Sequence, residues 1–512
     1  MMPVLSVVMA VYNVRNYLGE AVQSLIDQTI GLERLQIILV DDGSSDGSGE
    51  LCDAWKERYP DRIEVIHQEN RGVSAARNAG MALARGKYIN FMDADDRMDR
   101  QTAERAVRFL ENEGAEADVA SVPVFYFEGK EGEHWLNGKY RRGTRVIDLT
   151  EEYQVQQLMM NSAFFRRKAV EGICLEERMS ISEDARFVSE VLMKKQKLGV
   201  VAEGRYLYRS RRTHDSALNT QTRKPAWYVP ALRYGALYLL KEAREKRNEI
   251  PRWLQYTVFC DLKWRVVLDY EKEMQETISG EEQEEYRSLI REIMGYIADQ
   301  VIGETPEEVL EWPWKRWLIQ QKYPGAAVSW KEADRRLFYQ AAGIRVTELT
   351  ARPVWIRTEQ GDGKRVRVRG RLCLPPELSQ DDFRITLRSD SGMSQPCAAR
   401  LPEGACVRRF GEATECAWTF QGSVPAPAER EEIWHVEMGI PAQGQASVRF
   451  GCLQWAEGEA GSGASEAGRK RKWKAILTPD AIHLLPLPGM ITRMISKGRK
   501  IVRRKEHQGE NL

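Results

Sequence analysis

The sequence predicts an α/β protein with an open, Rossmann-like sheet domain, a helical region and a β-rich domain. Short apolar runs alternate with helical stretches over the first hundred residues. Long helical periodicity dominates from about residue 226, and period-two alternation, typical of half-buried strands, begins near residue 345. The expected boundaries are 1–225 for the α/β domain, 226–340 for the helical region, 345–485 for a β-sandwich-like domain and 486–512 for a basic tail.

The strands expected in the first domain are short and rich in Val and Ile, which is typical of parallel strands buried on both faces. They cover Val4–Met9, Ile37–Val40, Ile63–Ile66 and Tyr88–Met92. Helices are expected at Asn16–Gln28, Ser48–Arg58, Val73–Arg85 and Thr102–Glu113. This strand–helix alternation predicts an open parallel sheet.

Further elements follow from the same periodicities. A strand is expected at Val119–Phe127 and a helix at Asp184–Lys195. The helical region is expected to contain Pro230–Arg247, Trp253–Met274 and Glu281–Ile302. Its tryptophans are more typical of a core than of a sugar-binding surface: Trp253, Trp264, Trp312, Trp314 and Trp317. The β-rich domain is expected to contain Arg365–Leu374, Phe383–Leu387, Ala417–Phe420 and Trp434–Gly439.

The composition narrows the function classes. The 512 residues suffice for about three domains. With 76 basic and 75 acidic residues the net charge is +1, which argues against a chain-wide surface for nucleic acid. No two of the eight cysteines have CxxC spacing, so we expect reduced thiols rather than a zinc site. The chain shows neither a signal peptide nor a run of about 20 apolar residues, and we expect a cytoplasmic protein.

Four polar segments follow the four expected strands of the first domain. They are Ala10–Asn13, Val40–Asp46, Asn70–Asn78 and Asp93–Asp96. Each alone is explained by helix capping and a solvated loop. Because the carboxyl ends of parallel strands meet at one edge of a sheet, where open α/β sheets bind ligands, the four together predict a ligand site.

The residue types indicate a nucleotide diphosphate. The carboxylate of Asp42 can accept a hydrogen bond from N3–H of uracil. Of Asp93 and Asp95, one can reach a ribose while the other binds a divalent cation that neutralises a leaving diphosphate. Arg77 offers a fork for phosphate or carboxylate. The sequence lacks GxxxxGK[ST] and GxGxxG motifs, which removes the main support for kinase, ATPase and dehydrogenase functions.

Taken together, Ser6–Asn13, Ile38–Asp46, Asn70–Gly80 and Gly86–Asp96 resemble the GT-A glycosyltransferases of family 2, over roughly residues 4–220. The resemblance implies an inverting transferase that uses a nucleotide-sugar, usually a UDP-sugar, with Mg²⁺ or Mn²⁺. It places the uracil contact on Asp42 and the metal on Asp95. The nucleotide-binding residues that we expect are Val11, Tyr12, Asn13, Asp41, Asp42, Arg77, Asp93 and Ala94.

The family also carries a downstream Glu-Asp pair, which corresponds here to Glu183 and Asp184. The resemblance makes Asp184 the catalytic base, with Glu183 supporting it. Inversion needs a carboxylate that takes the acceptor's proton on the face opposite the leaving diphosphate. A helix cap is the alternative interpretation, because the pair opens an expected helix. Nearby helix N–H groups would keep such a base ionised.

The segment Tyr206–Ser216 corresponds to a loop that closes the donor site in family members. Its candidates for holding the diphosphate are Arg209, Arg211, Arg212, His214 and Ser216. A solvated basic loop is the alternative.

The order of regions resembles polyribitol-phosphate and wall teichoic acid glycosyltransferases, whose C-terminal part aids assembly or polymer binding. At the end of the chain, Met490, Ile491, Met494, Ile495, Ile501 and Val502 share a helical stripe among seven basic residues. Such a helix can lie on an anionic membrane surface, and a disordered tail is the alternative.

The sequence therefore predicts an inverting hexosyl- or N-acetylhexosaminyl-transferase of cell wall polysaccharide biosynthesis, peripheral on the inner face of the cell membrane. Its acceptor would be a cell-surface polysaccharide, a teichoic acid-like polyol-phosphate polymer or a lipid-linked sugar, and a homo-oligomer is left open. One alternative is a non-catalytic carbohydrate-binding or assembly protein with a degenerate transferase domain. Another is a sugar nucleotidyltransferase, although Ala10–Asn13 lacks the Gly-rich basic loop.

Overall fold

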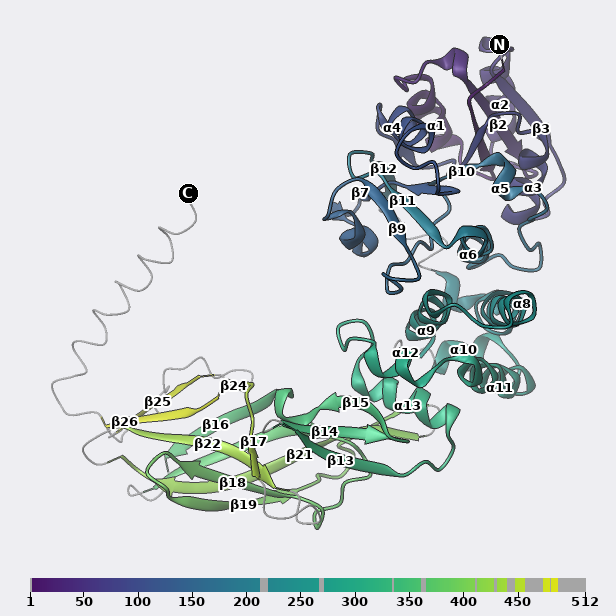
Figure 1. Ribbon diagram of the computed structural model, residues 1–512. Coiled ribbons are helices and arrows are strands. Elements are labelled where there is room, and N and C mark those ends of the chain that lie inside the picture. Colours follow the sequence, from purple (N-terminus) through teal and green to yellow (C-terminus); the bar gives the residue numbers. More distant parts are fainter. Residues whose placement is uncertain are drawn as a thin grey trace. The chain divides into compact units, whose positions relative to one another are not determined.

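The chain is described by a computed structural model that covers residues 2–211, 220–266, 271–333, 336–360, 365–409, 412–427, 431–439, 447–455, 473–478 and 480–486 (Figure 1). It forms two compact units, Met1–Thr305 and Pro306–Leu512. The stripe predicted within the basic tail lies outside the described residues, as do Arg212, His214 and Ser216.

The first unit is built on an eight-stranded sheet with the order β3-β2-β1-β4-β10-β6-β11-β9. The four parallel strands are β1 (Leu5–Val11), β2 (Leu35–Asp41), β3 (Ile63–His67) and β4 (Tyr88–Asp93). The predicted strands are confirmed, and the sheet continues through β10 (Ala163–Arg166), β6 (Val119–Ser121), β11 (Lys197–Val200) and β9 (Arg145–Asp148). β10 is antiparallel to both of its neighbours, which makes the sheet mixed.

The helices between the parallel strands are α1 (Arg15–Ile26), α2 (Ser48–Arg58), α3 (Val73–Leu83) and, after β4, α4 (Thr102–Glu111). The predicted bounds of α2 agree with the structure, and the other three helices end two residues earlier than predicted. α3 lies close against the sheet. A Cβ on its Gly80 would come within 2.4 Å of a Val8 methyl carbon, so this approach requires glycine.

A second sheet has the order β5-β12-β7-β8. Its strands are β5 (Arg97–Met98), β12 (Tyr206–Ser210), β7 (Val124–Glu128) and β8 (Gly132–Glu133). The prediction of one strand at Val119–Phe127 is wrong, because β6 and β7 belong to different sheets. Pro123 lies between them and has no N–H to donate to a ladder, which favours the change of sheet at this point.

The short helices of the first unit are η1 (Leu32–Arg34), η2 (Trp135–Tyr140), α5 (Arg167–Val170), η3 (Gln221–Arg223) and η4 (Pro225–Trp227). The longer ones after β10 are α6 (Glu183–Lys195), the π-helix η5 (Ala231–Leu237), α8 (Tyr238–Arg247), α9 (Arg252–Val266), α10 (Glu271–Thr277), α11 (Gly280–Tyr296) and α12 (Asp299–Glu304). η5 and α8 pack against α6, so helices up to Thr305 belong to the first unit rather than to a separate region. Within the described residues no helix is both long and apolar enough to cross a membrane.

The second unit begins with α13 (Trp312–Lys322) and an antiparallel sheet of β13 (Val328–Ala333), β14 (Arg336–Ala341) and β15 (Ile344–Glu348). The prediction of helix up to residue 340 is therefore wrong. Each strand is only six residues long, and over that length period-two alternation is hard to separate from helical periodicity. The tryptophans of α13 are buried as predicted.

The remaining β-rich part is an eleven-stranded sheet. Its strands are β16 (Val354–Gln360), β17 (Arg365–Leu374), β18 (Arg384–Ser389), β19 (Ser394–Arg400), β20 (Cys406–Arg409), β21 (Glu412–Pro425), β22 (Glu432–Gly439), β23 (Ser447–Arg449), β24 (Leu453–Trp455), β25 (Trp473–Leu477) and β26 (Ile482–Pro486). The alternation predicted for β17 is confirmed, because Val366, Val368 and Leu372 are buried.

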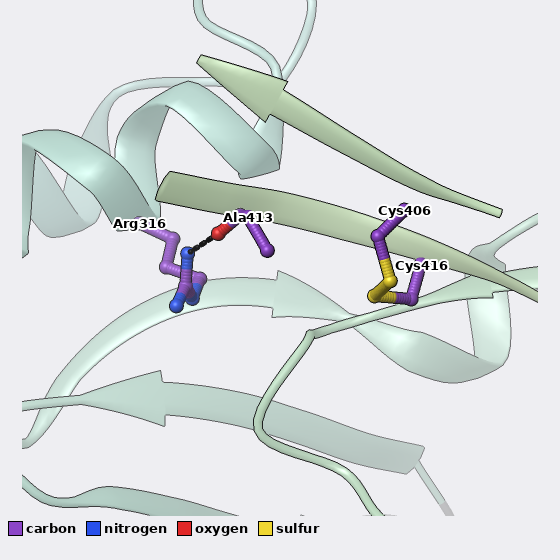
Figure 2. The surroundings of a disulfide bond; sticks show 4 residues. All are labelled: Arg316, Cys406, Ala413 and Cys416. Carbon is purple, nitrogen blue, oxygen red and sulfur yellow. Dashed lines mark hydrogen bonds between the residues drawn. A yellow bond between two sulfur atoms is a disulfide. The ribbon is translucent and has the colours of Figure 1, made fainter. Parts of the chain in front are cut away.

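A disulfide joins Cys406 of β20 to Cys416 of β21 (Figure 2). The two residues lie directly opposite each other in the antiparallel pair, with Cα atoms 4.0 Å apart. On the same strand, the carbonyl of Ala413 accepts a hydrogen bond from Nη1 of Arg316 at 3.2 Å (Figure 2). The expectation of reduced thiols is wrong for this pair, because strand register is decided by the fold and not by sequence spacing. The other six cysteines are free.

Candidate active site

The polar segments after the parallel strands meet at one edge of the sheet, as the sequence predicts. The backbone N–H of Asn13, which follows β1, donates to Oγ of Ser44 after β2 at 3.1 Å. The side-chain oxygen of Asn13 accepts from the N–H of Ser45 at 2.9 Å. Asn13 has φ 52°, a left-handed conformation that asparagine tolerates better than most residues. The first two segments therefore form one hydrogen-bonded surface.

Asp42 organises the loop that follows β3. Its carboxylate accepts from the side chain of Gln68 at 2.7 Å and from the backbone N–H groups of Arg71 and Gly72 at 2.9 and 2.8 Å. An ionised carboxylate has about four acceptor positions, so Asp42 can accept one further donor. Its neighbour Asp41 accepts from the N–H of Ser44 at 3.0 Å and lies 3.0 Å from Nδ1 of His67.

The segments after β1 and β4 differ in what they expose. The side chain of Val11 is fully buried, and its carbonyl accepts from the N–H of Asp42 at 2.9 Å. Ala94 is 4% exposed, whereas Tyr12 is 51% exposed. Tyr12 can therefore offer its ring to a ligand, while Val11 and Ala94 can contribute little beyond their backbone.

Arg77 of α3 joins the segment after β4 to the start of α6. Its Nη1 donates to Glu183 and its Nη2 donates to Asp93, both at 2.8 Å. The second carboxylate oxygen of Asp93 accepts from the side-chain amide of Asn161 at 2.9 Å. Burial alone would lower the pKa of Arg77, but the charges of the surrounding carboxylates raise it overall. The expected fork is thus engaged with two carboxylates of the protein itself.

Asp95 and Asp96 have different environments. One oxygen of Asp95 accepts from Nε and Nη2 of Arg211 at 2.9 and 2.6 Å. Burial, together with the charge of Asp93, raises the pKa of Asp95 despite this ion pair. Asp96 is almost completely buried and accepts from the Tyr206 hydroxyl and the N–H of Arg209 at 2.8 and 2.7 Å. Asp96 therefore ties β12 to the end of β4.

Among the diphosphate candidates, Arg209 and Arg211 differ. The guanidinium of Arg209 is 6% exposed, donates to Glu20 at 2.7 Å and to the carbonyl of Asp95 at 2.6 Å, and also pairs with Glu128. These contacts engage it in the protein, so its assignment to the diphosphate is not supported by the structure. Arg211 lies at Asp95, where a diphosphate bound through a cation would be.

The residues present fit a divalent cation that takes few of its ligands from the protein and most from the bound nucleotide-sugar and water. Within the described part of the chain, no group of three or more His, Cys, Asp or Glu side chains could hold a metal ion. Asp95 supplies the hard oxygen ligands that Mg²⁺ and Mn²⁺ prefer, while both oxygens of Asp93 are hydrogen-bonded. A cation at Asp95 would complete its coordination with diphosphate oxygens and water.

Asp184 is the second residue of α6. Its carboxylate accepts from the N–H of Ala185 at 2.8 Å. Burial in the first place, and the charge of Glu183 in the second, raise the pKa of Asp184 to about 7. These two effects oppose the hydrogen bond from the N–H of Ala185, which by itself lowers the pKa and favours the ionised form. A carboxyl group with this pKa suits a general base near neutral pH.

The residue before the Glu-Asp pair is held from the helical part of the unit. Ser182 has φ 63°, and its hydroxyl accepts from Nη2 of Arg265, in α9, at 3.3 Å. No sequence motif pointed to Arg265 or to Asn161. Tyr206 lies in the segment Tyr206–Ser216, which carries the diphosphate candidates, but its role as the partner of Asp96 follows only from the sheet topology.

Comparisons with known proteins identify the family of the chain. The model of the family described as Glycosyl transferase family 2 matches residues 6–174. The minor teichoic acid biosynthesis protein GgaB of Bacillus subtilis is 38% identical over 301 residues, which are 59% of this chain and 33% of GgaB. GgaA of the same organism is 31% identical over 303 residues, which are 58% of this chain and 68% of GgaA. The chain thus spans about a third of the length of GgaB.

Among solved structures, S. aureus TarS is similar over 96% of this chain and 86% of its own, with a TM-score of 0.52 and 14% sequence identity. TarS residues 1–349 in complex with UDP-GlcNAc match 66% of this chain and 96% of that one, with a TM-score of 0.50 and 16% identity. These similarities show that the fold is shared, from the sheet domain through the β-rich part.

Proposed function

The chain belongs to glycosyl transferase family 2, and we propose that it transfers a sugar from a UDP-sugar to a hydroxyl group of a wall-polymer acceptor with inversion at the anomeric carbon. The observation that carries the proposal is the bridge made by Arg77. It binds Asp93 on the donor side and Glu183 beside the base, each at 2.8 Å. The bridge fixes the segment that carries Asp95 and the segment that carries Asp184 relative to each other.

On the donor side, we assign Asp42 to the uracil N3–H, with Tyr12 and the backbone of Val11 beside the base. Asp93 is assigned to the ribose and Arg211 to the diphosphate. When bound at Asp95, Mn²⁺ or Mg²⁺ supplies charge neutralisation for the leaving diphosphate. The raised pKa values of Asp95 and of Asp96, both due first to burial, support a site in which negative charge is concentrated.

On the acceptor side, Asp184 takes the proton of the attacking hydroxyl. The hydroxyl oxygen bonds to the anomeric carbon as the bond from that carbon to the diphosphate oxygen breaks, and the proton passes to the Asp184 carboxylate. Glu183 stays paired with Arg77, and burial, followed by the charge of Glu183, raises the pKa of Asp184 so that it can receive the proton.

The acceptor class is supported by the relatives. GgaB and GgaA are named for minor teichoic acid biosynthesis, and the TarS structures include a complex with UDP-GlcNAc. We extend the proposal to a cytoplasmic enzyme that works at the inner membrane surface, where a lipid-linked polymer is accessible.

The direct test is a donor screen on the full-length chain. UDP-GlcNAc, UDP-GalNAc, UDP-glucose and UDP-galactose are tested with Mn²⁺ for a rise in Tm and for release of UDP when purified teichoic acid is added. We expect one donor to raise the Tm and to be consumed only when polymer is present. If no donor is bound or consumed while the chain still binds the polymer, the non-catalytic assembly alternative is correct. Pyrophosphate release from UTP would identify a nucleotidyltransferase.

A further inference from the structure

A pair of aromatic rings in the first unit is not used by the mechanism above. Among the described residues, the strongly exposed aromatic rings are those of Tyr12 and Trp135, at 51% and 55%. Tyr12 belongs to the donor segment. Trp135, the first residue of η2, belongs to no segment that the mechanism uses, although exposing a large ring to water is unfavourable.

Trp135 is paired with a tryptophan of the helical part. Its ring centroid lies 6.1 Å from that of Trp264 in α9, with an angle of 53° between the ring planes. The sequence interpretation placed Trp264 in the core together with Trp253. Trp253 is 2% exposed, as predicted, whereas Trp264 is only half-buried.

Contacts connect the pair to the base on one side. Trp264 directly precedes Arg265, whose guanidinium binds the hydroxyl of Ser182 at 3.3 Å. Ser182 is followed by Glu183 and Asp184 at the start of α6. Trp264 is thus the neighbour, along α9, of the residue that contacts Ser182 just before the proposed base.

Further ring contacts lead from the pair to the metal-binding segment. Trp135 contacts His134, His134 contacts Tyr126, and Tyr126 contacts Tyr208 of β12, with centroid distances of 5.7, 5.6 and 5.8 Å. Tyr208 lies in β12, whose Tyr206 hydroxyl and Arg209 N–H donate to Asp96. Ring contacts therefore connect the tryptophan pair to the strand that holds the Asp93–Asp96 segment.

Two ammonium groups lie beside these aromatic rings, in a surface that also contains the exposed Glu131 and Glu133. Nζ of Lys130 lies 4.1 Å from the ring centroid of Tyr126, and Nζ of Lys263 lies 5.2 Å from that of Trp264. Aromatic faces pack well against the apolar C–H face of a sugar ring, whereas an open-chain polyol presents no such flat face. Ammonium groups beside the rings favour an anionic chain.

From this arrangement, and resting on the proposed function, we propose that Trp135 and Trp264 form an acceptor subsite that stacks a pyranose ring of a phosphodiester-linked polymer. The subsite makes the enzyme select a polymer that contains sugar rings in its backbone over one built from open-chain polyol phosphates.

The test compares acceptor kinetics of wild type, Trp135→Ala, Trp264→Ala and the conservative variant Trp135→Tyr. Trp55→Ala is the matched control, because Trp55 is also partly exposed but contacts Tyr59 and Arg58 on α2. The probes are a polymer of hexose 1-phosphate units and poly(ribitol phosphate), and UDP affinity and Tm are measured for each variant. We expect either alanine variant to raise the KM for the hexose polymer by about tenfold, which corresponds to about 1.4 kcal/mol, while UDP affinity stays unchanged. Trp135→Tyr should retain most of the acceptor affinity.

The outcomes separate this inference from the proposed function. If wild type transfers no sugar to any polymer, the proposed function fails. If wild type transfers sugar but both alanine variants keep the wild-type acceptor KM, the subsite is overturned and the function stands. The subsite would also be overturned if wild type used poly(ribitol phosphate) as well as the hexose polymer. The same holds if the alanine variants lost affinity for UDP instead of for the acceptor.

Discussion

Arg77 and Glu183 are 106 residues apart in the chain, and Nη1 of Arg77 donates to Oε1 of Glu183 at 2.8 Å with both side chains buried. The same guanidinium holds Asp93 at 2.8 Å. Because one buried cation satisfies two carboxylates from distant segments, the relative position of donor site and base depends on a single side chain.

Replacing Arg77 by Met is expected to destabilise the fold by about 3–5 kcal/mol, because Glu183 and Asp93 would remain buried without their cation. Chemical denaturation at pH 7 measures this change. Arg71→Ala is the control, since the Arg71–Glu177 pair is exposed and such pairs contribute about 0–1 kcal/mol. Equal stability of the two variants would contradict the role given to the bridge.

Asp184→Asn is expected to lower kcat by about 10²–10⁴-fold, because an amide cannot take the acceptor's proton. UDP affinity, measured by calorimetry, should stay near that of wild type. Asp61→Asn, on the exposed segment between α2 and β3, is the control and should keep wild-type turnover. A variant Asp184→Asn with near-normal turnover would refute the assignment of the base.

The pH dependence of the rate follows from the same residue. Since the pKa of Asp184 is about 7 and only the ionised form is a base, the wild-type rate should fall as the pH drops below about 7. We expect a slope approaching tenfold per pH unit on this acid limb, measured with saturating donor. A rate that stays flat down to pH 5 would mean that another group takes the proton.

The free energy of unfolding should change with pH in the opposite sense to the rate. The folded pKa of Asp184 lies above its unfolded value, so the folded state binds more protons between about pH 4 and 7, and stability falls as the pH rises through this window. Asp184→Asn should remove this loss. At pH 8 it should be more stable than wild type by on the order of 2–4 kcal/mol, because one pKa unit corresponds to about 1.4 kcal/mol. Thermal denaturation of both proteins from pH 5 to 8 checks the prediction, and parallel curves would contradict it.

Asp95→Ala is expected to abolish the gain in UDP affinity that Mn²⁺ provides, because Asp95 is the carboxylate available to the cation. Calorimetry of UDP binding with and without Mn²⁺ measures the gain. Asp46→Ala is the control, since Asp46 accepts hydrogen bonds at the start of α2 and is not assigned to the metal. If Asp95→Ala still binds UDP more tightly with Mn²⁺, the metal assignment is wrong.

Much of the catalytic unit could be predicted from local patterns. Parallel strands buried on both faces read as apolar runs, and their ends place the polar segments at a common edge whatever the rest of the chain does. This is why Asp42 and Asp95 are candidates from the pattern of strands, whereas Asp184 is a candidate only through the resemblance of its Glu-Asp pair to the family. The bounds of the helices α1 to α4 could also be predicted to within about two residues, because their apolar faces repeat with the helical period.

The tertiary structure alone decided which partner each candidate has. Arg77 binds two carboxylates instead of a ligand, Arg209 binds Glu20 and Glu128, and Cys406 binds Cys416, because these partners are distant in sequence or depend on strand register. The tertiary structure also decided the pKa of Asp184, which burial and the charge of Glu183 raise although the helix N–H groups lower it. It likewise decided that Trp135 is exposed and contacts Trp264. The sequence alone determined the family, the sheet edge that carries the site and the kinds of group found there. The contacts among those groups, and hence their charge states and roles, depend on distances that only the folded chain defines.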